Sequence, residues 1–137
     1  MSDALVEIWQ ADACGRYRHP LDPQHGGADP AFRNFGRAST DDNGRFAFET
    51  VLPGVVRGPG GRPQAPHILV SVTARGVLTR YVTRLYFDGD ARNADDPILQ
   101  LVPAARRQTL MAVRAGDNRY AFDIRIQGAG ETVFFDA

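Results

Sequence analysis

The sequence contains no lysine, and only one of its 137 residues is a cysteine. A lone Cys14 cannot form an internal disulfide, which favours a reducing compartment, the cytoplasm. Cys14 lies in a turn-like stretch with no adjacent histidine, so we interpret it as an inert small residue. The sequence also lacks a long apolar run and a basic-then-apolar leader, so we expect neither a membrane-spanning helix nor export.

Neither sign of charge is in excess. Sixteen basic residues, all arginine, balance sixteen acidic residues, so no net field would draw the chain to nucleic acid or to anionic lipid. Hydrophobic residues at 43% and charged residues at 23% are typical of a globular domain. The length fits a single domain over residues 1–137 that can bury a substantial core.

Alternation of apolar and polar residues predicts β-strands at 4–10, 45–51 and 119–127. Two further runs, 67–75 and 80–87, are rich in β-branched residues and predict central strands. Asp42-Asn43-Gly44 predicts a tight hairpin between 36–40 and 45–51. A second turn, at 115–118, is expected to join strands at 109–114 and 119–127.

Proline and glycine concentrate in two segments, 19–35 and 53–66, which predict long surface loops of the kind that often carry function. One short helical turn is expected near residues 103–107. Short strands joined by turns, with so little helix, indicate an all-β chain. We expect an antiparallel β-sandwich of the prealbumin-like, Greek-key type.

Seven blocks in order resemble the intradiol ring-cleavage dioxygenases: VEIWQA at 6–11, GRYRH at 15–19, TDDNG at 40–44, PG at 53–54, APHI at 65–68, LYF at 85–87 and FDIR at 122–125. Some members of that family pair an iron-bearing beta chain with an iron-free alpha chain. Segments 65–68, 73–76, 83–87 and 130–136 are similar to the alpha type. The resemblance covers nearly the whole chain.

The catalytic chains of this family hold Fe(III) with two tyrosines and a His-x-His pair, since anionic oxygens suit a hard trivalent ion. The resemblance places Gln24 and Val56 at the two tyrosine positions. His67 and Leu69 stand where the two histidines would be. One ligand of four is retained, so the resemblance implies a vestigial iron site, with no catalytic residue and no metal in this chain.

The positions of an arginine and a glutamine near the substrate match Gln64 and Arg84 here. Strand alternation puts Arg75 on the same nominal face as His67 and Leu69. Because the resemblance implies an active site near the boundary between the two chains, Arg75 is a candidate contact with the partner's substrate pocket. The alternative is a solvated arginine at the strand end.

The resemblance implies a non-catalytic subunit that packs on a catalytic beta subunit carrying Fe(III). The assembled enzyme would open protocatechuate, an aromatic dihydroxy acid, with O₂ to give 3-carboxy-cis,cis-muconate. Residues 40–54 also resemble transthyretin-like sandwiches, so a stand-alone binding module is the alternative. A metal site built from His19, His25 and His67 is a third possibility, although no ligand spacing links them.

The alpha chains of the family carry a segment ahead of the part that matches residues 3–5, and this chain begins almost on the first strand. We expect that a sheet edge and a partner-contacting arm are missing. An unpaired edge is a template for association. Self-association through that edge is therefore expected as well.

Overall fold

Alternating burial builds the centre of the sheet. In β1 (Leu5–Gln10) and β5 (His67–Thr73), every second residue is buried, and the two strands pair antiparallel. Val6 and Ile8 of β1 and Val70 and Val72 of β5 share one face. We call this side of the sheet the core face, and we call the opposite side, which carries Trp9 and Leu69, the His67 face.

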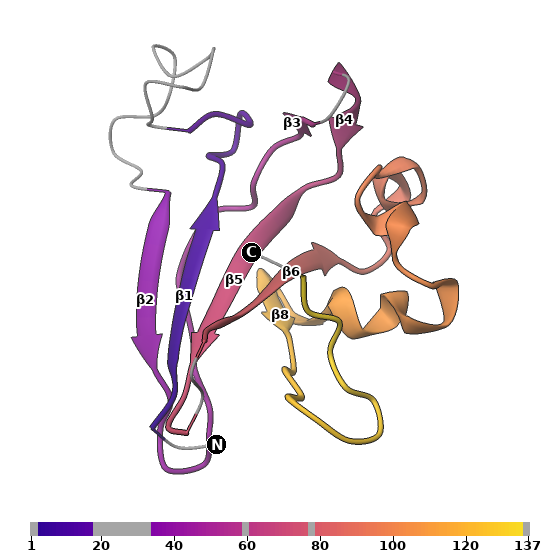
Figure 1. Ribbon diagram of the computed structural model, residues 1–137. Helices are drawn as coiled ribbons and strands as arrows, with labels where there is room; N and C mark the ends of the chain where they lie inside the picture. Colours follow the sequence, from indigo (N-terminus) through magenta and orange to yellow (C-terminus); the bar gives the residue numbers. More distant parts are fainter. Residues whose placement is uncertain (1–2, 18–33, 59–60, 77–78, 136–137) are drawn as a thin grey trace.

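The computed structural model (Figure 1) describes residues 3–17, 34–58, 61–76 and 79–135. A six-stranded sheet has the strand order β2-β1-β5-β6-β7-β8, and β3 and β4 form a separate ribbon. Figure 1 shows the sheet curling, with the 3₁₀ segments η3 to η5 along one side. The remaining elements are β2 (Phe35–Ser39), β3 (Val56–Arg57), β4 (Pro63–Gln64), β6 (Tyr81–Phe87), η3 (Ala91–Asp95), η4 (Leu99–Leu101), η5 (Ala104–Leu110), β7 (Met111–Gly116) and β8 (Arg119–Ala121).

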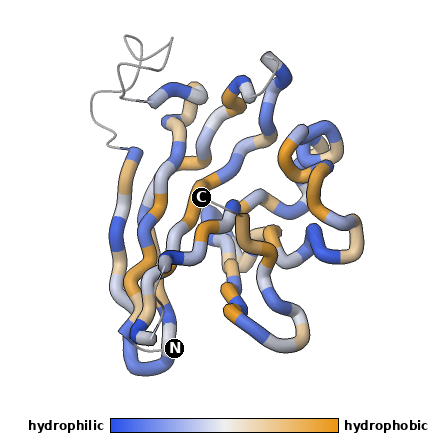
Figure 2. Tube along the Cα trace, in the orientation of Figure 1, coloured by the Kyte–Doolittle hydropathy of each residue, from blue (hydrophilic) through white to orange (hydrophobic). Residues whose placement is uncertain are grey.

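Two apolar clusters hold these elements together. The first lies on the core face, where Phe46, Phe48 and Ile124 pack against the buried residues of β1 and β5. The second joins Tyr86 and Ala65 to Leu99, Val102 and Leu110 of the 3₁₀ region. Figure 2 shows apolar stretches alternating along the strands, with the turn at 41–44 hydrophilic.

The predicted sheet content is confirmed, but the predicted strands are wrong in three larger respects. Residues 45–51 form no strand, although their alternation does point Phe46 and Phe48 at the core. The Asp42–Gly44 turn is present, with the Gly44 amide bonded to the Asp41 carbonyl at 2.9 Å. It does not close a β-hairpin, because the chain beyond it lies over the core face and is not paired with β2.

The second wrong detail is the length of the predicted 119–127 strand, which ends at Ala121. The hairpin of β7 and β8 is confirmed, with a register shift near Gly116. The third concerns strand direction, because β6 and β7 pair in parallel through two residue pairs, Tyr86–Met111 and Phe87–Ala112. A long crossover makes this pairing possible, and it contains η5, where a helical turn was expected, as well as η3 and η4, which were not.

Two loops cross in backbone contact near the start of the chain. The Asp12 carboxylate accepts the amides of Cys14 and Arg16, both at 2.9 Å, and closes a tight turn. At its tip Gly15 has φ +80°, and a Cβ there would lie 2.1 Å from the Val55 carbonyl oxygen. Only glycine fits this crossing.

Candidate functional site

His67 opens β5 and is nearly buried, with 7% of its surface exposed. Its Nδ1 lies 2.8 Å from the Ala65 carbonyl oxygen. Because a carbonyl only accepts, Nδ1 carries the proton and Nε2 carries the lone pair. Burial and, after it, the Arg84 cation lower the pKa of the imidazole below its usual value. His67 is therefore neutral near pH 7.

Arg84 lies on β6 as the register partner of Leu69. Its Nη1 donates to the Gln64 Oε1 at 2.7 Å and, more weakly, to the Tyr86 hydroxyl at 3.4 Å. Gln64, 8% exposed, pairs with Val56 in the β3–β4 ribbon. The strand register and this hydrogen bond bring five of the predicted positions into one neighbourhood: Val56, Gln64, His67, Leu69 and Arg84.

A buried carboxylate lies behind this neighbourhood. Asp96 is fully buried, and its oxygens accept the Tyr86 hydroxyl at 3.0 Å and the amides of Ala65, Ile98 and Leu99 at 2.8 to 3.0 Å. Burial raises the pKa of the Tyr86 phenol far above its usual value, so the phenol stays protonated and donates. These bonds fix the end of β6 to the 3₁₀ region.

Sequence analysis missed Asp96 as part of this network. The available signal was Asp96-Pro97 followed by the apolar pair Ile98-Leu99. An aspartate ahead of a proline often caps the following turn through its side chain. What the sequence could not show is that the same carboxylate also reaches Tyr86 and Ala65.

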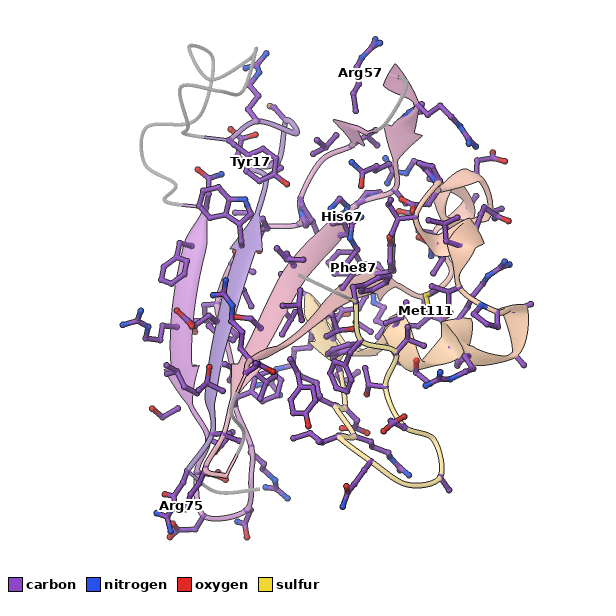
Figure 3. All side chains as sticks on the ribbon, viewed as in Figure 1. Tyr17, Arg57, His67, Arg75, Phe87 and Met111 are labelled. Atoms are coloured by element: carbon purple, nitrogen blue, oxygen red, sulfur yellow. The ribbon has the colours of Figure 1, made fainter. Side chains whose placement is uncertain are left out.

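The two ends of β5 differ (Figure 3). His67 lies at one end of the strand, and Arg75 lies beyond the other. The Arg75 side chain is 83% exposed and forms an ion pair of 2.7 Å with Asp3. The expected unbroken strand to residue 75 ends at Thr73. The role of Arg75 toward a partner stays a prediction.

Three predicted positions, Gln24, His19 and His25, lie outside the described residues. Cys14 is exposed. Trp9 and Tyr17 stack with ring centroids 5.5 Å apart and an interplanar angle of 11°.

The donors that are described do not fit ferric iron. Of the three described positions that the resemblance assigns to iron ligands, Val56 and Leu69 offer hydrocarbon and only His67 offers a lone pair. The neighbouring cation, Arg84, would repel a metal ion. Across the described residues, no group of three or more His, Cys, Asp or Glu side chains is placed to hold a metal.

A hollow of about 270 Å³ lies between η5, β7, β8 and the chain that follows β8, with Asp123 and Arg125 among its lining residues. None of the candidate site residues lines it. Within the described ranges, no helix is long and apolar enough to cross a membrane.

Comparison with known proteins agrees with the resemblance. A family model described as Dioxygenase matches residues 1–128. The chain is 49% identical to the protocatechuate 3,4-dioxygenase alpha chain of Pseudomonas putida, over 98% of this chain and 67% of that protein. The Burkholderia cepacia alpha chain is 47% identical, over 99% of this chain and 69% of that protein. The Burkholderia cepacia beta chain is 39% identical, over 95% of this chain and 59% of that protein.

The chain thus spans about two thirds of the length of these alpha chains. Two catechol 1,2-dioxygenases are more distant, at 32% and 31% identity. The family model covers almost the whole chain, and the similarity to the two alpha chains extends over 98 to 99% of this chain. The chain belongs to the intradiol dioxygenase family.

Proposed function

We propose that this chain is the non-catalytic alpha subunit of a protocatechuate 3,4-dioxygenase and packs against a beta chain that carries Fe(III). The observation that carries the proposal is that Val56 and Leu69, at positions where the resemblance expects iron ligands, have hydrocarbon side chains. Identity to alpha chains, at 47 to 49%, exceeds identity to the beta chain, at 39%, over a similar span of this chain. This pattern supports a chain whose iron site is vestigial.

The proposed reaction belongs to the assembled enzyme. It is the opening of protocatechuate between its two hydroxylated carbons, with both atoms of O₂ entering the product, 3-carboxy-cis,cis-muconate. The iron of the beta chain would supply the redox chemistry. Here, Gln64 and Arg84 are tied to each other at 2.7 Å, and we assign them a structural part in this chain's own fold.

We extend the proposal to architecture and location. Residues 45–51 and 122–127 present Phe46, Phe48 and Ile124 to the core face. Their position supports a sandwich whose second layer they would form. A cytoplasmic location is proposed from the single, exposed Cys14.

The test is co-purification. When this chain is mixed with a cognate beta chain that has the Tyr, Tyr, His-x-His pattern, the two should co-elute in fixed ratio on size-exclusion chromatography. The pair should consume O₂ with protocatechuate. This chain alone should be colourless, free of stoichiometric iron and inactive, because tyrosinate-to-iron charge transfer needs the two tyrosine ligands, and the resemblance places Gln24 and Val56 at those positions.

Two outcomes would contradict the proposal in different ways. A visible band with stoichiometric iron in the isolated chain would refute the vestigial site. Failure to bind any beta chain, with a stable monomer or self-oligomer instead, would favour the stand-alone binding module.

A further inference from the structure

The hollow beside β8 lies apart from the His67 neighbourhood. Its lining comes from η5, β7, β8 and the chain after β8, which is the yellow loop next to β8 in Figure 1, and none of its described lining residues belongs to β5 or β6. Its volume of about 270 Å³ is slightly below the range of about 300 to 1,000 Å³ that is typical of pockets for drug-sized ligands. The size of the hollow therefore suits a smaller molecule.

One wall of the hollow is apolar. Val113 and Ala121 are register partners on β7 and β8, and Met111 lies two residues before Val113 on the same strand. Partners across a ladder, and alternate residues along a strand, project to the same side. All three side chains line the hollow, and Val113 is 47% exposed. An apolar group placed on this wall would remove exposed hydrocarbon from water.

Two opposite charges lie along the chain after β8. Asp123 and Arg125 are exposed, and both line the hollow. Burial alternates from residue 122 to residue 127, as in an extended chain, where residues two apart project to the same side at a spacing of about 6.6 Å. Among the described residues, Asp123 and Arg125 form no ion pair, either with each other or with another charge. The hollow therefore presents a carboxylate and a guanidinium that do not neutralise each other.

The turn at 128–131 holds the Arg125 side chain in place. The Arg125 amide donates to Thr132 Oγ1 at 2.9 Å, and Nη1 donates weakly to the Ala129 carbonyl oxygen at 3.4 Å. A Cβ at Gly130 would lie 3.5 Å from Nη1, so the guanidinium packs directly over this glycine. Nε and Nη2 donate to no acceptor within the part of the chain that the structure describes. These two donors can bond both oxygens of a carboxylate.

We propose that this hollow binds a free α-amino acid with an apolar side chain, such as leucine. The carboxylate of the ligand would bond to Arg125, and its ammonium group would pair with Asp123. Its side chain would lie on the apolar wall formed by Met111 and Val113. A ligand that carries both charges satisfies both residues, whereas a simple anion or cation leaves one of them unpaired. Because both residues are exposed, we expect affinity in the millimolar range.

Met111 provides a local readout of binding. The sequence contains two methionines, Met1 and Met111, so a chain labelled with carbon-13 in its methionine methyl groups gives two methyl signals by NMR. The Met111→Leu variant identifies the signal of Met111. The isolated full chain is titrated with L-leucine, and we expect a saturable shift of the Met111 methyl signal.

Three analogues of leucine test the separate contacts. N-acetyl-L-leucine lacks the ammonium charge, and L-leucinamide lacks the carboxylate. Each should bind at least tenfold more weakly than L-leucine. Glycine keeps both charges but has no apolar side chain, so it should also bind more weakly.

Asp123→Asn and Arg125→Gln each remove one of the two charges, and each should weaken leucine binding at least tenfold. Asp117→Asn and Arg114→Gln are the matched controls, since both residues are exposed on the same hairpin and do not line the hollow. Both controls should bind leucine like the parent chain. Circular dichroism checks that each variant folds. If Arg125→Gln does not fold, the result for Asp123→Asn decides, because that change is isosteric and exposed.

An unshifted Met111 signal in the folded parent chain with excess L-leucine would overturn the proposal. Equal binding of leucine, N-acetyl-leucine and leucinamide, or unchanged binding in a folded Asp123→Asn variant, would overturn it as well. No beta chain enters the experiment, so its result is independent of whether the subunit assignment holds.

Discussion

The two ends of β5 carry polar residues of the same nominal face in opposite environments. At one end, His67 is buried beside Tyr86, Arg84 and Asp96, and its proton is fixed by a backbone carbonyl. Past the other end, Arg75 is exposed and paired with Asp3 at the surface. Alternation along a strand predicts the face to which each side chain points. How deeply that side chain is buried depends on what packs against its end of the strand.

The difference has a physical origin. At the His67 end, Leu99 and Val102 of the 3₁₀ region pack with Ala65 and Tyr86 in one apolar cluster, so polar groups there lose water and must find partners. No such cover lies over Arg75, whose ion pair is solvated. Substitutions at the His67 end should therefore cost far more stability than substitutions at the Arg75 end.

The largest effect is expected at Asp96. Asp96→Ala leaves the amides of Ala65, Ile98 and Leu99 and the Tyr86 hydroxyl without an acceptor. We expect a loss of about 3 kcal/mol or more in the free energy of unfolding, measured by urea denaturation.

Asp95→Ala is the matched control, because Asp95 is the exposed neighbour at the end of η3. Its effect should stay within about 0.5 kcal/mol. Similar losses in the free energy of unfolding for the two variants would mean that the buried hydrogen bonds of Asp96 do not stabilise this end of the sheet.

A smaller effect should appear as pH dependence at His67. Burial and Arg84 lower its pKa in the folded state, so the unfolded chain binds the proton more readily as pH falls below about 6.5. This contribution makes the folded state progressively less stable from pH 7 toward pH 5. His67→Gln should flatten that part of the profile, measured by thermal unfolding across this range.

Arg75→Ala should keep the pH profile of the parent chain and serves as the comparison for His67→Gln. An unchanged profile in His67→Gln would assign the acid sensitivity to other groups. The contrast between the two ends of β5 would then rest on hydrogen bonding alone.

The smallest effect on stability is expected at Arg75. Losing its exposed ion pair should change the free energy of unfolding of Arg75→Ala by less than about 0.5 kcal/mol. If Arg75 faces the partner's pocket, the same variant in the complex should raise KM for protocatechuate more than for catechol, because the fork favours a carboxylate. Steady-state oxygen uptake with both substrates measures the two KM values. Equal changes in KM for protocatechuate and catechol would mean that Arg75 is a surface residue only.

How far the sequence predicted the fold depends on what each signal reports. Alternation located β1, and runs rich in β-branched residues located β5 and β6, each within two residues, because these strands have both a buried face and a paired neighbour. At 45–51 and 122–127 the same alternation is present without strand pairing. Alternation therefore reports which side chains face the core and does not report hydrogen bonding between strands.

The candidate site was predictable residue by residue but not as a network. The resemblance selected Gln64, His67 and Arg84, and the register brings them together. Asp96 was missed, because its role depends on a crossover of 3₁₀ turns that has no periodic signal. The parallel pairing of β6 with β7 was missed for the same reason.

The glycine crossing near the start of the chain sets a limit on redesign. At Gly15 a methyl group would meet the Val55 carbonyl oxygen at 2.1 Å, and at Gly54 it would meet the Gly15 amide nitrogen at 2.5 Å. Both obstacles are main-chain atoms, so no change of rotamer or neighbouring side chain can relieve them. Positions 15 and 54 must therefore stay glycine in any redesigned sequence if the two loops are to keep this backbone contact.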